Sequence, residues 1–392
     1  MKSELIVNLQ VYPCSLKHAS RILKTSNSLI SQGLIQKDYI WATGNGDSER
    51  QLEIGMNQVL LMSRLPHNYR SLMKKSLFGF VSMLWKLVGY YLGIISKVRS
   101  LKPDFVTCRR VDLLPFCVLA MPFGKKVSRL IYSPHELESE KEGLSIILKR
   151  TFRVIERLFI RYTDSVIVVN EPIRNWYFDA YGHSSIYAIR NLPLPNLALG
   201  LSKDILRNKF KIGSNEILCI YQGILSESRG IPYILKTFSS LRRKDLHIVF
   251  MGFGALENEI KKQSELHSNI HFQPSVPINE IVSYTASANI GIVFFPQNVG
   301  LSYEFCLPNK FGEYLNAGLP ILVSSNLSYM SKLIKENKIG WVLDEKNENS
   351  LIDFLESITN KELQIRLHNV SIFSESFNWQ EEEKIFKNPY KL

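Results

Sequence analysis

The sequence predicts an α/β protein made of two tandem Rossmann-like domains. Its 392 residues are too many for one ordinary hydrophobic core, and 45% of them are hydrophobic, which is enough for two cores. Strand-like and helix-like segments alternate through both halves, a pattern typical of parallel sheets covered by helices. The prolines of RNLPLPN, residues 190–196, interrupt the alternation before it restarts.

The hinge between the domains is expected at roughly residues 192–200. We assign residues 1–195 to an N-terminal domain and residues 196–372 to a second domain. The tail, residues 373–392, has no strand pattern. It is therefore expected to form a helix that crosses back onto the first domain.

The elements follow from the period of the apolar residues. In the first half, strands are expected at residues 4–12, 38–44, 103–108, 129–136, 164–170 and 184–191, with helices at 15–33, 144–162 and 171–181. In the second half, strands are expected at 216–223, 246–254, 270–276, 289–295, 320–324 and 340–343. Helices are expected after Arg229 and at 255–266, 278–287, 307–320, 328–336 and 348–357.

The net charge of +12 lies entirely in the first half of the chain. Residues 1–200 carry 27 Lys and Arg against 15 Asp and Glu, whereas residues 201–392 carry 21 of each. A basic half indicates an anionic partner, which could be nucleic acid, an anionic membrane surface or an acidic substrate. The basic residues are dispersed and form no nucleic-acid-binding signature, so we expect no nucleic acid partner.

Residues 74–99 form a long apolar run that is flanked by Lys74, Lys75 and Arg99 and interrupted by Lys86. The run almost reaches the roughly 20 apolar residues of a membrane-spanning helix, but Lys86 stands at its centre. Aromatic and leucine side chains with basic edges suit a helix that lies on a membrane surface. A core helix of the first domain is the third alternative, and all three stay open.

The cysteines and the N-terminus both indicate a cytoplasmic protein. Five cysteines are scattered along the chain without a CxxC pair or the spacing of a zinc site, and reduced thiols are expected. The N-terminal sequence MKSELIVNLQVYP enters a strand pattern without the features of a secretory leader. Secretion is therefore not expected, and a peripheral position on the inner face of the cell membrane fits the basic first half.

The segment YQGILSESRGIPYIL, residues 221–235, has the pattern of a phosphate-binding turn. A strand ends at Gly223, and Arg229 and Gly230 precede a helix. Backbone N–H groups at such a turn can approach a phosphate, and Arg229 can donate a charge-assisted pair of hydrogen bonds to a diphosphate. An ordinary strand-to-helix turn has similar residues and remains the alternative.

The segment FMGFGALENEI, residues 250–260, argues against a dinucleotide cofactor. Gly252 begins a Gly-x-Gly after a strand, but the third glycine and the later acidic residue of the dinucleotide fingerprint are missing. P-loop, HExxH, GxSxG and metal–diphosphate Asp-x-Asp patterns are missing too. We expect no cofactor and no obligatory metal.

The segment YSPHELESEKEG, residues 132–143, follows a predicted strand. His135 and Glu136 at its carboxyl end are placed for hydrogen bonding to a ligand or for proton transfer, and a buried structural histidine is the equal alternative. The glutamates at 138, 140 and 142 are expected to lie in a solvated loop.

The helix LPNKFGEYLNAGLP, residues 307–320, carries polar residues in its first turns. Pro308 suits the first helical position, and the helix N-terminus beside Asn309 and Lys310 favours an anion. Glu313 lies on the same side of the helix, where it can accept both hydroxyls of a ribose. A local Lys310–Glu313 ion pair is the structural alternative.

Together these segments resemble the retaining glycosyltransferases of the GT4 type, which have the GT-B fold. The second half is similar to their nucleotide-sugar domain in GILSESRGI, GFG and LPNKFGEYLNAGLPILVS, and the first half is similar to their acceptor domain in HELESE, DSVIVVNEPIRNWYFDAYG and RNLP. The resemblance implies two Rossmann-like domains that face each other across a cleft. It also implies a nucleotide-sugar donor bound by the second domain and an acceptor bound by the first.

The resemblance also assigns roles to single residues. Glu313 matches the ribose-binding second glutamate of the family's E-x7-E motif, and Arg229 matches the basic residue that contacts the diphosphate. His135 resembles the histidine that contacts the transferred sugar. We predict His135, Arg229 and Lys310 as catalytic residues, and list the nucleotide-sugar-binding residues as Gly223, Arg229, Gly252, Pro308, Asn309, Lys310 and Glu313.

Two positions depart from the family pattern. Phe305 stands where the first glutamate of the motif is expected, and Glu304 is one place off. Ile224 replaces the second basic residue, directly after Gly223. The contacts to the sugar hydroxyls are therefore unassigned, and the diphosphate is expected to depend on Arg229, Lys310 and helix N-termini.

The predicted activity is retaining transfer of a hexosyl or N-acetylhexosaminyl group from a nucleotide-diphosphate sugar to a lipid-linked or polysaccharide acceptor in cell-surface glycan synthesis. Two alternatives stay open. A nucleotide-sugar 2-epimerase has the same two-domain architecture, and a non-catalytic sugar-nucleotide-binding protein would tolerate the two departures from the motif.

Overall fold

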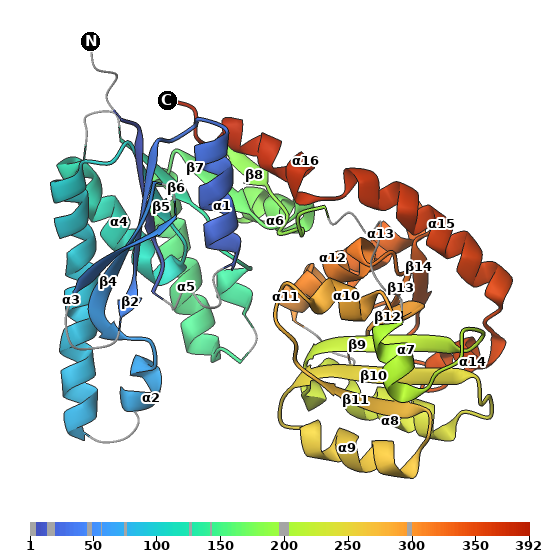
Figure 1. Ribbon diagram of the computed structural model, residues 1–392. Coiled ribbons are helices and arrows are strands. Elements are labelled where there is room, and N and C mark those ends of the chain that lie inside the picture. The colour runs from blue at the N-terminus through green and yellow to red at the C-terminus, as the bar shows by residue number, and fades with distance from the viewer. Residues whose placement is uncertain are drawn as a thin grey trace. The chain divides into compact units, whose positions relative to one another are not determined.

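The computed structural model describes residues 5–13, 20–44, 49–55, 57–73, 77–124, 128–141, 143–195, 204–295 and 300–392. Some residues named above lie outside these ranges. They are Lys74, Lys75, Glu142 and residues 196–200 of the expected hinge. Two compact units make up the chain (Figure 1). The first comprises Met1–Arg190 and Glu382–Leu392, and the second comprises Asn191–Glu381.

The first unit is built on an eight-stranded sheet with the order β3-β4-β2-β1-β5-β6-β7-β8. Its strands are β1 (Val7–Val11), β2 (Lys37–Gly44), β3 (Arg50–Gly55), β4 (Gln58–Pro66), β5 (Phe105–Cys108), β6 (Arg129–Tyr132), β7 (Ser165–Val168) and β8 (Ile186–Ala188). The strands pair in parallel except β3, which is antiparallel to β4. The predicted elements include neither β3 nor β4. Every residue of β3 is exposed and gives no buried apolar face to detect, whereas β4 is largely buried and is missed despite its apolar residues.

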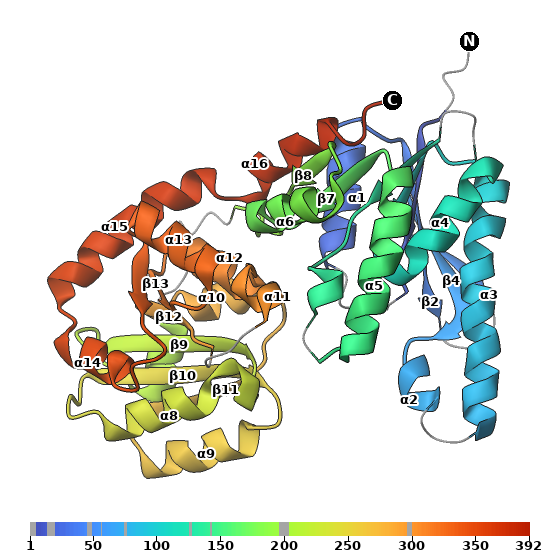
Figure 2. The same ribbon diagram turned by 180° about the vertical axis from the view of Figure 1, so that it is seen from behind.

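Helices cover both faces of this sheet, as Figures 1 and 2 show. They are α1 (Ser20–Ser31), α2 (Tyr69–Met73), α3 (Leu77–Leu101), α4 (Leu114–Ala120), α5 (Ile146–Phe159) and α6 (Glu171–Tyr181). Helix α1 lies on one face, while α4 and α5 lie on the other, with α3 packed beside α4. Parallel strands with helices on both faces place the carboxyl ends of the strands at one edge of the sheet.

Helix α3 contains the apolar run that begins at residue 74. Its second half is anchored in the core: Tyr90 is buried, and its hydroxyl donates to the Trp41 carbonyl oxygen at 3.1 Å. Gly93 allows a close approach, because a Cβ there would lie 2.7 Å from the Trp41 ring. No helix of the described ranges, α3 included, is long and apolar enough to cross a bilayer.

The second unit is built on a six-stranded parallel sheet with the order β11-β10-β9-β12-β13-β14. Its strands are β9 (Ile217–Ile224), β10 (Leu246–Phe253), β11 (Ile270–Pro274), β12 (Ile290–Val293), β13 (Ile321–Ser324) and β14 (Gly340–Leu343). Its helices are α7 (Ile205–Phe210), α8 (Ile231–Ser240), α9 (Glu257–Leu266), α10 (Ile281–Thr285), α11 (Leu301–Glu304), α12 (Asn309–Asn316), α13 (Ser328–Asn337), α14 (Ser350–Ser357) and α15 (Asn360–Ser376). Helix α16 (Trp379–Glu383) follows at the junction of the two units.

Two hydrophobic cores hold the second sheet between its helices. One lies against α7, α10, α12 and α13, and includes Leu206, Phe311 and Met330. The other lies against α8, α9 and α14, and includes Ile234 and Leu351. The apolar residues on both faces of each strand explain why the strands read as continuous apolar runs.

The C-terminal tail returns to the first unit. Arg190 donates to the Glu382 carboxylate through its backbone N–H at 2.7 Å and through its guanidinium. The Tyr390 hydroxyl lies 2.8 Å from the Thr107 hydroxyl in the core of the first unit. The predicted α/β fold with two Rossmann-like sheets and a returning C-terminal helix is therefore confirmed. The part of the tail that belongs to the first unit is residues 382–392.

Candidate active site

The candidate site lies in the second unit, at the carboxyl ends of β9, β10 and β11 beside the start of α12. A cavity of about 370 Å³ opens there. Its lining includes Gly223, Arg229, Gly252, Pro308, Asn309, Lys310 and Glu313. These are all the residues that the sequence predicts for nucleotide-sugar binding. A crevice at the carboxyl ends of parallel strands is the usual ligand position in such sheets.

Two glycines form the bare backbone of the cavity. Gly223 and Gly252 pair in register on β9 and β10. A Cβ on Gly252 would lie 1.9 Å from the Gly223 carbonyl oxygen, so no side chain fits at that position. Gly223 has a φ of 117°, in the region that favours glycine. The backbone at this point is therefore open to close approach by a ligand.

Helix α12 begins at Asn309, one residue later than predicted. Pro308 is its N-cap residue rather than its first helical residue, because its ψ of 154° is extended. The Asn309 side-chain oxygen accepts a hydrogen bond from Asn191 at 3.0 Å. The core face of the helix is formed by Phe311, Tyr314 and Leu315, which are buried.

Lys310 turns toward β9. Its ammonium nitrogen lies 3.9 Å from the centre of the Tyr221 ring. It also approaches Gly223, where the position of an ideal Cβ is 3.6 Å from the Lys310 Nζ. Burial of the ammonium group, followed by the charge of Arg229, lowers the pKa of Lys310 to about 7.

Glu313 is held by a residue that the sequence does not single out. Its carboxylate accepts a hydrogen bond from the side-chain amide of Gln222, and the Gln222 oxygen accepts from the Thr285 hydroxyl at 2.7 Å. Gln222 and Thr285 are both buried. Burial raises the pKa of Glu313, while the Gln222 bond and the Lys310 charge act in the opposite direction. The only available signal for Gln222 is a polar residue within an apolar strand.

The Lys310–Glu313 ion pair, which is the structural alternative for this helix, is not formed between these two described residues. Lys310 packs on Tyr221 and Glu313 bonds to Gln222. The local ion pair therefore does not explain their proximity. Both side chains line the same cavity.

Arg229 ends a short 3-10 turn, Glu227–Arg229, directly before α8. Its guanidinium lies over the rings of Phe295, at 4.9 Å, and Tyr303, at 5.0 Å. These aromatic faces hold the planar group without consuming its N–H donors. Arg229 and Lys310 thus place two cationic side chains on one cavity that contains a single carboxylate among its described lining residues, Glu313.

His135 belongs to the first unit, three residues after the end of β6. Its ring lies 4.9 Å from the Tyr12 ring, and its buried Nε2 has no hydrogen-bond partner among the described residues. Burial, then the positive charges of Arg21, Arg109 and Lys141, lowers the pKa of His135 well below its usual value. The imidazole is therefore neutral at pH 7.

The loop that follows His135 is less solvated than expected. Glu138 is buried, with its carboxylate 3.8 Å from the Lys141 ammonium group, and burial raises its pKa to about 7. Glu140 pairs with Lys149 at 3.9 Å and with Arg153. The expectation of a solvated loop is wrong for Glu138, because the short 3-10 turn Glu138–Glu140 folds it against the core.

The structure shows where the residues that depart from the family motif lie. Phe305 is the C-cap residue of α11, and the backbone oxygen of Glu304 accepts from the Ser328 hydroxyl at 3.2 Å. Ile224 is 51% exposed at the rim of the cavity, together with Phe253 and Ile278. The rim is thus apolar where the family has a second cation. Among the described residues, no cluster of side chains could hold a metal ion.

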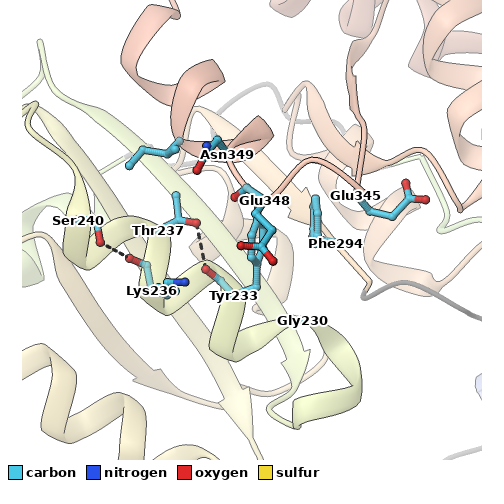
Figure 3. A pocket seen from close by; sticks show the side chains of 10 residues that line it. Gly230, Tyr233, Lys236, Thr237, Ser240, Phe294, Glu345, Glu348 and Asn349 are labelled. Carbon is cyan, nitrogen blue, oxygen red and sulfur yellow. Dashed lines mark hydrogen bonds between the residues drawn. The ribbon is translucent and has the colours of Figure 1, made fainter.

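A second hollow of about 430 Å³ lies between α8 and the segment before α14 (Figure 3). Tyr233 stacks on Phe294, with ring centres 4.8 Å apart, and its hydroxyl donates to the Glu348 carbonyl oxygen at 3.1 Å. Thr237 and Ser240 donate to carbonyl oxygens of their own helix. Although it is the larger hollow, much of its polar surface is already engaged, and it contains none of the predicted residues.

Comparison with known proteins identifies the same architecture. Residues 234–379 match the family described as Glucosyltransferase 3-like, C-terminal domain. No curated protein matches the sequence.

Solved structures match over nearly the whole chain. A sucrose-phosphate synthase from Thermosynechococcus elongatus has 13% identity, a TM-score of 0.71 and 98% coverage of both chains. A trehalose-6-phosphate protein from E. coli, bound with UDP-2-fluoro glucose, has 12% identity, a TM-score of 0.70 and coverage of 98% of this chain and 99% of that one. HepE from Anabaena, in complex with UDP and glucose, has 12% identity, a TM-score of 0.67 and 97% coverage of both. The predicted GT-B fold is thereby confirmed, and residues 234–379 match a Glucosyltransferase 3-like C-terminal domain.

Proposed function

We propose that the protein is a retaining glycosyltransferase that takes a hexosyl or N-acetylhexosaminyl group from a nucleoside-diphosphate donor. The main support is the cavity of the second unit, where two cations, a bare glycine backbone and one oriented carboxylate meet. UDP is the favoured nucleotide, because the similar structures of HepE and of the E. coli trehalose-6-phosphate protein hold UDP compounds.

Each element of the cavity suits one part of such a donor. Arg229 and Lys310 would bind the diphosphate, together with the backbone at Gly223 and Gly252 and the start of α12. Glu313, held by Gln222, would accept the ribose hydroxyls. The exposed apolar rim of Ile224, Phe253 and Ile278 would cover the base.

The chemical step would depend on stabilising the leaving group. As the bond from the sugar to the diphosphate breaks, negative charge grows on the diphosphate, and Arg229 and Lys310 would stabilise that charge. No separate carboxylate nucleophile lines the cavity among its described residues, which fits entry of the acceptor hydroxyl on the face that the diphosphate leaves.

The acceptor is proposed to be lipid-linked or a polysaccharide, reached at the inner face of the cell membrane. Support comes from α3, which exposes an apolar stripe from Phe80 to Leu92: Phe80, Val81, Leu84, Trp85, Val88 and Leu92. Helix α5, in the same layer of helices, adds exposed Ile146 and Ile147 (Figure 2). The excess positive charge of the first half complements an anionic bilayer.

A donor-turnover assay separates this proposal from its two alternatives. The full chain is incubated with UDP-, GDP- and ADP-sugars radiolabelled in the sugar, together with a membrane lipid extract. Transfer predicts label in the lipid or glycan fraction with the anomeric configuration of the donor retained. An isomerised donor would instead identify an epimerase, and tight binding without turnover would identify a binding protein.

Matched variants tie the assay to the cavity. Glu313→Ala should weaken donor binding by about 1 to 3 kcal/mol, because a carboxylate hydrogen-bonded to ribose is lost. Glu348→Ala, in the second hollow, should leave donor binding unchanged. If the two variants bind the donor equally well, Glu313 is not part of the site.

A further inference from the structure

Several polar side chains of the first unit gather at the carboxyl edge of its sheet, outside the donor cavity. Strands β1, β5 and β6 are neighbours, and backbone bonds tie their ends together. The Arg109 N–H donates to the Val11 carbonyl oxygen at 3.2 Å, and the Ser133 N–H donates to that of Cys108 at 2.7 Å. Arg109, Tyr12 and His135 therefore share this edge.

Arg109 is a buried cation without a direct anionic partner. It is 1% exposed, and it donates to the Gln10 side-chain oxygen through Nε at 3.0 Å and to the Ser133 hydroxyl through Nη1 at 2.9 Å. No carboxylate is hydrogen-bonded to it in the described part of the chain. Asp38 is reached only through Gln10, whose amide donates to it at 2.5 Å.

Arg21, the second residue of α1, is also buried, with 7% of its surface exposed. Its Nη2 donates to the Ile189 carbonyl oxygen at 3.0 Å, but its buried Nε has no hydrogen-bond partner among the described residues. Glu382 is the nearby carboxylate, and both of its oxygens already accept from Arg190. Burial, then the charge of Arg109, lowers the pKa of Arg21 to about 9.

His135 completes the group. Its Nε2 is a second buried polar atom without a described partner, and the charges of Arg21 and Arg109 are among those that lower its pKa. Buried donors without acceptors are rare and costly, and the charge of Arg109 opposes the charge of Arg21, whose pKa it lowers. An oxyanion would satisfy the Arg21 Nε donor and offset both positive charges.

We propose that Arg21, Arg109 and His135 bind an oxyanion, phosphate or carboxylate, that is carried by the acceptor substrate. The assignment to the acceptor rests on the proposed function, in which the first unit binds the acceptor. It adds a requirement that the donor cavity does not contain: the acceptor is anionic. It also gives the basic first half a specific ligand.

Anion binding by the full-length chain tests the proposal. Equilibrium dialysis measures binding of radiolabelled inorganic phosphate at constant ionic strength to the wild type, Arg21→Met and Lys310→Met. We expect Arg21→Met to weaken phosphate binding about tenfold or more, because a charged hydrogen bond is lost. Lys310→Met should retain this binding and lose UDP binding. Equal phosphate binding by wild type and Arg21→Met would overturn the proposal.

Failure of the proposed function has a different signature. If Lys310→Met binds UDP normally but Arg21→Met loses phosphate, the oxyanion site stands and the donor assignment falls. Competition by acetate identifies the source of the anion. Strong competition indicates an acidic sugar, and weak competition indicates a phosphorylated acceptor. No binding of either anion by the wild type would contradict the site.

Thermal unfolding separates binding from a purely structural role of Arg21. If the main role of Arg21 is to bind an anion, Arg21→Met should not lower the melting temperature in chloride, because the substitution removes an uncompensated buried charge. The same variant should lose the stabilisation by phosphate. If Arg21 serves only as a donor to Ile189, the variant melts earlier and keeps the phosphate effect. Arg21→Lys, which keeps the charge, should retain part of the phosphate effect, and full loss of that effect on a folded protein would count against charge recognition.

Discussion

The sequence predicts where Lys310 lies, at the start of a helix, but the burial and the neighbouring charges of its ammonium group follow only from the fold. Its place at the start of a helix after a strand predicts a role toward an anion. Its pKa of about 7 depends on burial, on Arg229 and on the opposing charge of Glu313. In the absence of a ligand, the ammonium group therefore loses its proton as the pH rises through about 7.

This titration predicts pH-dependent donor binding. The diphosphate binds the charged ammonium and stabilises it, so above pH 7 binding must be accompanied by proton uptake. UDP affinity should fall roughly tenfold between pH 7 and pH 8.5. Isothermal titration calorimetry in buffers of different ionisation enthalpy measures both the affinity and the proton uptake. Lys310→Arg should bind UDP with an affinity that does not fall over this pH range. If the affinity of Lys310→Arg still falls as the pH rises, another group titrates.

The residues that hold the charged side chains are harder to predict than the charged side chains themselves. Arg229, Lys310 and Glu313 follow from strand ends and helix starts. Gln222 and Thr285 form one chain of hydrogen bonds with Glu313 only because α10 packs beside β9. The alternative Lys310–Glu313 ion pair has suitable spacing but does not form, because Lys310 packs on the Tyr221 ring and Glu313 accepts from the Gln222 amide. Such competition is decided by tertiary packing.

At the scale of elements, the alternation of strands and helices is predictable and the β3–β4 hairpin is not. Most predicted strands are apolar runs, since the parallel strands are covered on both faces. Strand β3 is exposed and lies at the edge of the sheet, so it has neither signal, whereas β4 is largely buried and its apolar run is missed by the prediction. For α3, the sequence indicates an apolar helix but cannot tell which face is covered, because that depends on how Trp41 and α4 pack against it.

The exposed half of α3 predicts binding to anionic membranes. Trp85 is 72% exposed there and is expected to insert its ring at the interface. Flotation with vesicles containing anionic phospholipid should show binding that falls steeply as salt rises, since the basic residues contribute at long range. Trp85→Glu should reduce the bound fraction several-fold.

A matched control uses Ile372, which is 57% exposed on α15 of the second unit. Ile372→Glu makes the same kind of change on a surface outside the stripe, so it should leave vesicle binding unaltered. If both variants lose vesicle binding equally, or if Trp85→Glu binds vesicles at the wild-type level, α3 is not the membrane-binding surface.

At the scale of the whole molecule, the two sheets and the returning tail can be predicted from the sequence. Which unit binds which substrate cannot be predicted from the sequence pattern alone. The tail joins the first unit because Phe386 and Tyr390 are each 2% exposed in its core. Donor binding is proposed for the second unit because Arg229, Lys310 and Glu313 line one cavity there. The oxyanion assigned to the first unit would make the acceptor anionic.

The central claim is that the second unit binds a nucleoside diphosphate at the ends of β9 and β10. A crystal structure of the full chain with UDP tests it most directly. We predict the diphosphate beside Arg229, Lys310 and the Gly223 backbone, with the ribose hydroxyls on Glu313. UDP bound in the hollow between α8 and α14, or no UDP in the second unit at a saturating concentration, would contradict the account.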